Sequence, residues 1–297
     1  MLRIIADSTC DISKEDARKM GIQIVPISVR FGNEEFLDGV EITHEEFYTR
    51  LAECDELPKT SQPSPDTFMK VFNEAVADGD DVLGIFISSD LSGTYQSACL
   101  AASDVEDETG KKLYMVDSRS ASIGTALLIR EAVKLRDAGV NVSDIAAACT
   151  EMSKYIKLTA VVGSLKYLKM GGRLSGAAAF AGTMLHITPV VSIEDGKVVV
   201  IGKTRGKKAA EKLMHDKLTK DGLSLTRDFM FGHINCSESL ETFINKSLTY
   251  ILDVNGNVGV SSIGCSVGTH VGPGTYGIAY VEAVESGMNR ESIVKTA

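Results

Sequence analysis

The stretch VLGIFISSDLSGTYQSA, residues 82–98, contains the pattern that decides the fold. Its apolar run, Val82–Ile87, passes into a polar loop and then into a helix that we expect to begin near Thr94. The same order returns at Leu113–Val116, where a second loop leads to a helix starting near Ser120. Short apolar runs that alternate with helices are typical of parallel strands buried under helices on both faces. The sequence therefore predicts an α/β fold.

The pattern extends over the first 157 residues, which we predict to form an N-terminal α/β domain. Arg3–Asp7 is an apolar run that ends in polar residues, as expected of another buried strand. Three helices have recognisable starts, because a residue that caps a helix N-terminus stands before each of them. Their caps are Ser13, Thr43 and Ser64.

Residues 158–297 are predicted to form a second α/β domain, since 297 residues exceed the size at which one core keeps growing. Asp195-Gly196 separates two β-branched runs, which predicts a hairpin turn. Helices and strands then alternate between Lys207 and Ile263. The segment after Gly274 is expected to be an edge strand that follows a glycine-rich loop.

Composition excludes several classes of protein. A net charge of −9 and a pI near 5.2 disfavour a nucleic-acid partner, because phosphate binding needs a basic face. No apolar run reaches the roughly 18 residues of a spanning helix, and an acidic residue follows the start too soon for a signal peptide, so we expect a cytoplasmic protein. The six cysteines form no C-x-x-C pair and the five histidines no H-E-x-x-H motif, so we expect no metal site.

Two polar loops combine hydroxyl groups with helix starts. Lys59–Pro65, KTSQPSP, precedes a helix, and helix capping alone is one explanation of its hydroxyls. Ser88–Ala98, SSDLSGTYQSA, lies where backbone N–H groups and the helix dipole favour an anion, and capping is again the alternative. The candidate hydroxyl residues of these loops are Thr60, Ser61, Ser64, Ser92 and Thr94, and Gly93 lets a ligand approach the backbone.

A third loop, GTHVGPG at Gly268–Gly274, places His270 between glycines. A structural histidine is one interpretation, but a glycine-rich loop also leaves room for a ligand. An imidazole beside an anion has a raised pKa and donates a charge-assisted hydrogen bond near neutral pH. The three loops together suit a monoanionic head group such as a carboxylate.

Two basic segments, KYLKMGGRLSG and KTRGKKAAEK, contain Arg173 and Arg205. They are either solvated helix faces or a docking surface for a negatively charged partner.

Catalytic motifs are incomplete: IGKT lacks the first glycine of a phosphate-binding loop, and no G-x-S-x-G is present. A serine-dependent acyl hydrolase using Ser92 and His270, with Asp7 or Asp117 as the orienting acid, stays open as an alternative.

The ordered blocks IIADSTCDIS, KTSQPSP, SSDLSGTYQSA, VDSRSAS, GGRLSG and GTHVGPG resemble the DegV family from Leu2 to Glu282. This resemblance implies a fatty-acid-binding subunit of a bacterial fatty-acid kinase, with two α/β domains and the ligand between them. It implies that a long-chain fatty acid is the ligand and that no cofactor is bound. A separate kinase subunit, resembling dihydroxyacetone kinases, would supply ATP and metal and form the acyl phosphate. A lipid-responsive sensor is a further alternative, and transient membrane contact is compatible with this role.

The resemblance also implies roles for particular residues. Arg173 and Arg205 would lie near the opening and engage the kinase. The tunnel would draw on residues 177–187 and on Ile27, Phe31 or Ile123, although each of these fits a plain core better than a tunnel wall. Burial of about fourteen methylenes at roughly 0.8 kcal/mol each outweighs a charge-assisted hydrogen bond of about 1.5–3 kcal/mol. The carboxylate would be held by Thr60, Ser61, Ser92, Gly93, Thr94 and His270.

Overall fold

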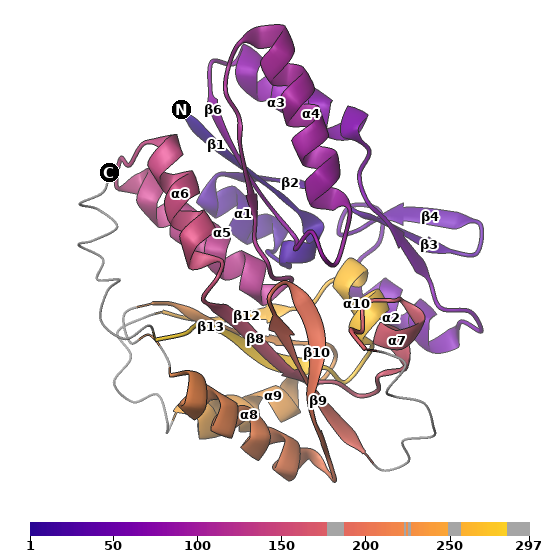
Figure 1. Ribbon diagram of the computed structural model, residues 1–297. Helices are drawn as coiled ribbons and strands as arrows, with labels where there is room; N and C mark the ends of the chain where they lie inside the picture. The colour runs from indigo at the N-terminus through magenta and orange to yellow at the C-terminus, as the bar shows by residue number, and fades with distance from the viewer. Residues whose placement is uncertain (177–186, 223, 225–226, 249–256, 284–297) are drawn as a thin grey trace.

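The first sheet is parallel and four-stranded (Figure 1). The computed structural model describes residues 1–176, 187–222, 224, 227–248 and 257–283. Strands run in the order β2 (Ile22–Val25), β1 (Leu2–Asp7), β6 (Asp81–Phe86) and β7 (Tyr114–Asp117). The parallel sheet predicted from residues 82–98 is confirmed.

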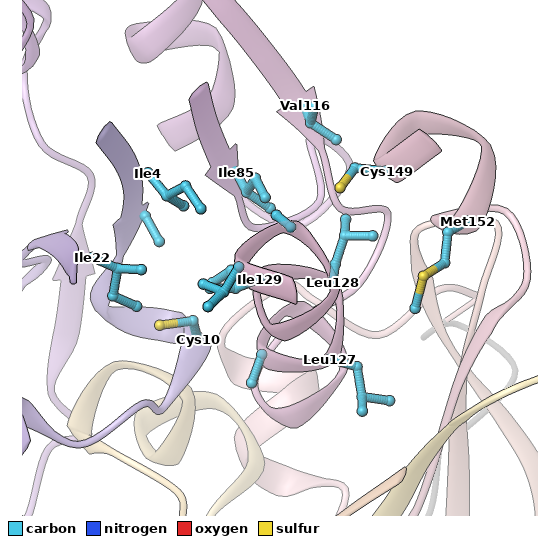
Figure 2. Packing of buried hydrophobic residues seen from close by; sticks show 14 of the residues in the cluster. Ile4, Cys10, Ile22, Ile85, Val116, Leu127, Leu128, Ile129, Cys149 and Met152 are labelled. Atoms are coloured by element: carbon cyan, nitrogen blue, oxygen red, sulfur yellow. The ribbon is translucent and has the colours of Figure 1, made fainter. Parts of the chain in front are cut away.

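Helices cover both faces of this sheet. One face packs on α3 (Pro65–Ala77) and α4 (Thr94–Thr109), and the other on α1 (Lys14–Met20), α5 (Ile123–Asp137) and α6 (Val142–Met152). Successive side chains of a strand point to opposite faces, so each strand contributes to both cores. Figure 2 shows one of these cores, where Ile4 and Ile85 of the sheet meet Leu128 and Ile129 of α5.

The predicted helix caps are confirmed. Ser13, Thr43 and Ser64 each accept a hydrogen bond from the backbone N–H three residues later. Thr43 forms a full capping box with Glu46 at the start of α2 (His44–Glu53).

The second sheet has six strands and is mainly antiparallel. Only β11 and β12 pair in parallel among its described strands. The outer face packs on α8 (Lys207–Asp221) and α9 (Ser237–Leu248), at the bottom of Figure 1. The order is β10 (Lys197–Thr204), β9 (Thr188–Glu194), β8 (Ile156–Val161), β13 (Tyr276–Val281), β11 (Phe229–His233) and β12 (Val258–Ser262).

The expected edge strand after Gly274 is wrong, because β13 lies in the middle of this sheet, between β8 and β11. All six residues of β13 are buried, as a central strand covered on both faces requires. Among the described residues, no helix is both long and apolar enough to cross a membrane.

Helix α5 lies between the two sheets. Its first seven residues, Ile123–Ile129, are all buried, as expected of a helix with packing partners on every side. One apolar cluster joins this helix to Ile4 of the first sheet and to Met230 and Ala279 of the second. The predicted division after residue 157 falls inside β8 and stays a prediction.

The hairpin of β9 and β10 joins the two sheets at its tip. Asp195 and Gly196 both have positive φ, +48° and +81°, which confirms the predicted hairpin turn. The Ser88 hydroxyl donates to the Gly196 carbonyl at 2.8 Å, and Arg119 pairs with Asp195 at 3.0 Å. The tip therefore fastens the second sheet to the loops that follow β6 and β7.

A small antiparallel sheet lies beside these layers. Its strands are β4 (Glu34–Leu37), β3 (Ser28–Phe31) and β5 (Lys59–Ser61), and it packs with α2 against α10 (Cys265–Val271). This places a segment from the start of the chain against a helix near its end.

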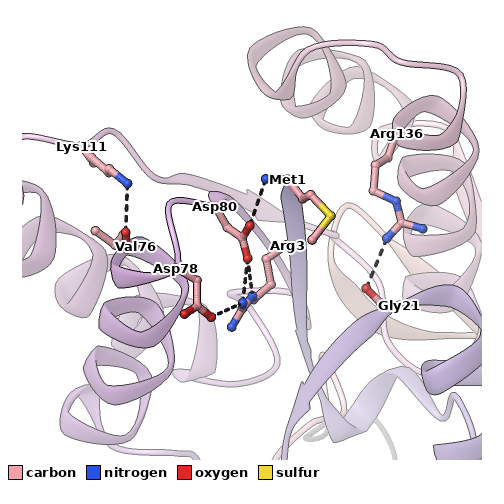
Figure 3. A network of polar contacts seen from close by, with 8 residues as sticks. All are labelled: Met1, Arg3, Gly21, Val76, Asp78, Asp80, Lys111 and Arg136. Atoms are coloured by element: carbon pink, nitrogen blue, oxygen red, sulfur yellow. Dashed lines mark hydrogen bonds and ion pairs between the residues drawn. The ribbon is translucent and has the colours of Figure 1, made fainter.

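The amino ends of the first sheet carry a polar network (Figure 3). The Asp80 carboxylate accepts from the Met1 amino group at 2.9 Å and from Arg3 at 2.6 Å. These two cations hold the pKa of Asp80 below its ordinary value. The network lies at the opposite end of the strands from the polar loops, so it stabilises the sheet and takes no part in the site.

Candidate functional site

A cavity lies among the two sheets, α5 and α10. It encloses about 930 Å³ of non-atom space, a volume that includes the solvent at its opening. Most wall residues are apolar, so the cavity suits a hydrocarbon. They are Ile27, Ile87, Leu91, Ala121, Ile123, Leu158, Ala160, Val162, Leu168, Val191, Ile193, Val198, Ile263, Val267 and Val271.

The proposed tunnel residues are distributed unevenly over this wall. Ile27 and Ile123 line the cavity, whereas Phe31 packs against the ring of Phe47 at 5.6 Å between centroids. Residues 177–186 of the predicted small-residue segment lie outside the described residues. Strands β8 and β9 also line the cavity, which was not predicted from the sequence. Their alternating residues, which share one face, are Leu158, Ala160, Val191 and Ile193.

Four polar residues from distant parts of the chain meet on the wall: Thr60, Ser92, Arg173 and His270. The Thr60 hydroxyl and His270 Nε2 are hydrogen-bonded at 2.8 Å. The Arg173 guanidinium donates to the carbonyl oxygens of Leu91 at 3.1 Å and Gly171 at 2.6 Å. We call these four residues the polar cluster.

The other predicted site residues lie off the wall. Ser61 is exposed and points away from Thr60, because neighbouring strand residues face opposite sides. The Thr94 hydroxyl is buried and forms a 2.9 Å hydrogen bond with the Ser92 hydroxyl, so it helps to orient Ser92 without lining the cavity. Gly93 packs on the Gln62 side chain, where an added Cβ would lie 2.1 Å from Oε1.

Arg205 is exposed and outside the cavity, between β10 and α8. Arg173, which was predicted to dock the kinase together with Arg205, lines the cavity and is partly buried. The two arginines therefore occupy different environments.

The glycine-rich segment around His270 is partly helical, contrary to the predicted loop. Cys265–Val271 forms α10, with His270 in its last turn. Its N-terminus is capped by the Asp38 carboxylate, which accepts from the N–H groups of Cys265 at 3.2 Å and Ser266 at 3.1 Å. Since this cap comes from more than 200 residues away, no local sequence window reveals it. Gly268 serves close packing here, because an added Cβ would lie 2.2 Å from the Tyr48 hydroxyl oxygen.

Burial and, to a smaller extent, the positive charge of Arg173 lower the pKa of His270 to about 4. The imidazole is therefore neutral near pH 7 in the ligand-free protein. Its Nδ1 atom is buried and has no hydrogen-bond partner among the described residues. The expected raised pKa applies to an imidazole beside an anion, and a bound carboxylate would supply that charge.

We expect His270 to make the ligand-free protein less stable in acid. Between the ordinary pKa of 6.5 and about 4, the unfolded chain binds a proton that the folded chain does not. The free energy of unfolding therefore falls as the pH falls through this window, by about 3 kcal/mol in total. We expect His270→Gln to reduce the difference in unfolding free energy between pH 7 and pH 4.5 by about 2 kcal/mol, measured by urea denaturation of delipidated protein. An equal difference in both proteins would contradict the buried neutral imidazole.

The geometry does not assemble a serine hydrolase. Ser92 bonds Thr94, whereas His270 bonds Thr60, so the proposed nucleophile and base have other partners. Asp7 accepts from the backbone N–H of Ile87 at 2.9 Å and does not orient the imidazole. Asp117 accepts from the N–H groups of Ser89 and Arg119.

One group of metal-binding side chains occurs among the described residues. The ligand atoms of Asp38, His44 and Cys265 lie within 4.8 Å of one another. The Asp38 carboxylate already accepts hydrogen bonds from the Ser8 hydroxyl and the start of α10. Burial and the nearby Asp38 carboxylate raise the pKa of the Cys265 thiol, which disfavours the thiolate that a metal needs. Asp38 therefore acts as a helix cap, and the absence of a metal stays a prediction.

Comparison with known proteins places the chain in a family. Residues 1–283 match the family model described as "Uncharacterised protein, DegV family". A DegV domain-containing protein of Clostridium perfringens is 35% identical over 290 residues, covering 95% of this chain and 98% of that protein.

Two solved structures show the same architecture. A fatty-acid-binding DegV family protein from Thermus thermophilus is 31% identical with a TM-score of 0.86, covering 95% of this chain and 100% of that one. A stearic-acid-binding protein from Eubacterium ventriosum is 28% identical with a TM-score of 0.81, covering 95% and 98%. The chain belongs to the DegV family.

Proposed function

We propose that this protein binds a long-chain fatty acid, buries the acyl chain in the cavity and holds the carboxylate at the polar cluster. The observation that carries the proposal is an apolar cavity whose wall includes Arg173, a partly buried cation bonded only to backbone carbonyls among the described contacts. A carboxylate beside it would provide the missing countercharge. The fatty-acid-binding relatives from Thermus and Eubacterium support this choice of ligand.

The protein presents the carboxylate to a separate kinase subunit and makes no acyl phosphate by itself. Three features support this role. The sequence lacks a complete phosphate-binding loop, Ser92 and His270 are hydrogen-bonded to Thr94 and Thr60 and not to each other, and the polar cluster lies on the wall of a mainly apolar cavity. The kinase would supply ATP and metal. The proposal places the protein in the cytoplasm and assigns it no cofactor.

Native mass spectrometry and lipid extraction of the purified protein test the binding. We expect a fatty acid of defined mass that is released on denaturation, and reloading of delipidated protein with palmitate at one molecule per chain. Protein that neither retains nor takes up a fatty acid would refute the proposal. If lipid binds but no DegV-associated kinase phosphorylates it, a lipid-responsive sensor becomes the better description.

We expect the two arginines proposed for kinase docking to differ in their effects. Leu174 bridges to Val198 at the start of β10, and Arg205 lies seven residues further along. At about 3.3 Å per residue, the strand separates Arg173 from Arg205 by roughly 20 Å. Arg205→Ala should therefore spare palmitate affinity and lower the phosphorylation rate about tenfold. Arg173→Ala should lower both, because its side chain lines the cavity.

Titration calorimetry with palmitate and a kinase assay at saturating lipid distinguish these cases. Equal phosphorylation by the wild type and Arg205→Ala would remove Arg205 from the partner surface. Unchanged palmitate affinity in Arg173→Ala would restrict that arginine to docking.

A further inference from the structure

Ser266 belongs to the cavity wall and carries a hydroxyl for which the described residues supply no hydrogen-bond partner. It lies in the first turn of α10, lines the cavity and is 2% exposed. Its backbone N–H donates a hydrogen bond to the Asp38 carboxylate, but its side-chain oxygen is buried and has no hydrogen-bond partner among the described residues. Most buried hydroxyls are hydrogen-bonded. Of the buried, unpaired serine hydroxyls among the described residues, those of Ser120, Ser192 and Ser266, only that of Ser266 belongs to the cavity wall, where a ligand could supply the partner.

The other deeply buried hydroxyls of the wall differ from Ser266. Thr9 donates to the Asp7 carboxylate, and Ser122 donates to the Asp11 carboxylate. The Thr275 hydroxyl donates to the Gly272 carbonyl at 2.9 Å. Each of these side chains uses its hydroxyl in a hydrogen bond within the protein. Ser266 is the position where an apolar ligand would leave a protein hydroxyl unpaired.

We propose that the preferred ligand is a hydroxylated fatty acid, whose chain hydroxyl pairs with the Ser266 hydroxyl. This inference rests on the proposed fatty-acid function and names the class of acid. An unsubstituted chain that covers Ser266 removes water from its hydroxyl and offers no replacement. A chain hydroxyl both donates and accepts, so it satisfies Ser266 and is satisfied in return.

The position of Ser266 limits where the ligand hydroxyl lies. Ser266 and His270 are four residues apart on one face of α10, which corresponds to about 6 Å along the helix axis. With the carboxylate near His270, a few carbon–carbon bonds of about 1.5 Å span this separation. The hydroxyl therefore belongs to the part of the chain near the carboxylate and not to its methyl end.

Four acids of equal length test the inference: palmitate, 3-hydroxypalmitate, 5-hydroxypalmitate and 16-hydroxypalmitate. Affinities are measured by titration calorimetry with delipidated wild type, Ser266→Ala and Ser247→Ala. Ser247 is a matched control, because it is a fully buried serine on α9, outside the cavity, with its hydroxyl bonded to the Phe243 carbonyl. Near-ultraviolet circular dichroism verifies that each variant is folded.

We expect the wild type to bind one of the two proximal hydroxy acids at least about fivefold more tightly than palmitate. In Ser266→Ala, palmitate should bind more tightly than in the wild type, and the preference should shift toward palmitate by about tenfold or more. Ser247→Ala should keep the wild-type ratio.

Two results would overturn the inference without touching the fatty-acid function. The first is wild-type palmitate affinity equal to or above that of both proximal hydroxy acids, as expected if ordered water satisfies Ser266. The second is a ratio that Ser266→Ala leaves unchanged, or a preference for 16-hydroxypalmitate. Failure of all four acids to bind would instead refute the proposed function itself.

Discussion

Ala160→Phe is expected to lower the affinity for palmitate by about 100-fold or more. Ala160 is 6% exposed and lies on β8 between Leu158 and Val162, whose side chains also line the cavity. A phenyl ring at this position occupies space that the acyl chain needs. Exclusion of four methylenes at roughly 0.8 kcal/mol each corresponds to about 3 kcal/mol, or about 100-fold in affinity.

Titration with palmitate measures the effect, and Val161→Ala provides the control. Val161 is the next residue of the same strand and packs on the opposite face with Val190 and Phe231. This control is expected to be less stable than the wild type but to bind palmitate with similar affinity. Tight palmitate binding by folded Ala160→Phe would show that the chain lies elsewhere.

His270→Ala is expected to separate binding from presentation. Removal of the imidazole takes away a partner of Thr60 at the polar cluster but leaves the apolar wall intact. Chain burial dominates the affinity, so palmitate binding should fall only about tenfold. A carboxylate held less firmly by even about 1 Å reacts roughly 100-fold more slowly, so kinase-dependent phosphorylation should fall at least that much.

Phosphorylation is measured at saturating palmitate with the kinase and ATP, so that the binding defect does not limit the rate. His215→Ala is the control, because His215 is a buried histidine on α8 that stacks on Phe243, outside the cavity. It should lose stability without a selective loss of phosphorylation. Equal losses of binding and phosphorylation in His270→Ala would argue against separate roles for chain and head group.

Local sequence determined most helices and strands of the first half. Ser13, Thr43 and Ser64 cap their helices as predicted, because a cap needs only a side chain and the N–H three residues away. Val82–Ile87 predicts a buried strand for a similar reason, since strand burial on two faces leaves an unbroken apolar run. The ordered motifs between Leu2 and Glu282 indicated the family.

Tertiary structure decided the second sheet and the form of the site. The buried residues of β13 fit any covered strand, and only pairing with β8 and β11 makes it central. Helix α10 depends on a cap from Asp38, which lies far away in sequence. The polar loops were recognisable in the sequence from Thr60, Ser92 and His270. The distances between these three side chains were not, because they depend on how the loops fold together.

The residues proposed to bind the carboxylate were visible in the sequence, whereas the cavity proposed to bind the acyl chain was not. Hydroxyls and a histidine in glycine-rich loops predict an anion site by their chemistry, with helix capping as the alternative, so this prediction came from the sequence itself. The cavity depends on which side chains of β8, β9, α5 and α10 converge. Only that convergence places Arg173, predicted from the sequence as a docking residue, on the cavity wall and adds Ser266 to it. Long-range packing creates both the apolar volume and the unpaired hydroxyl within it, and neither follows from the order of residues along a single element.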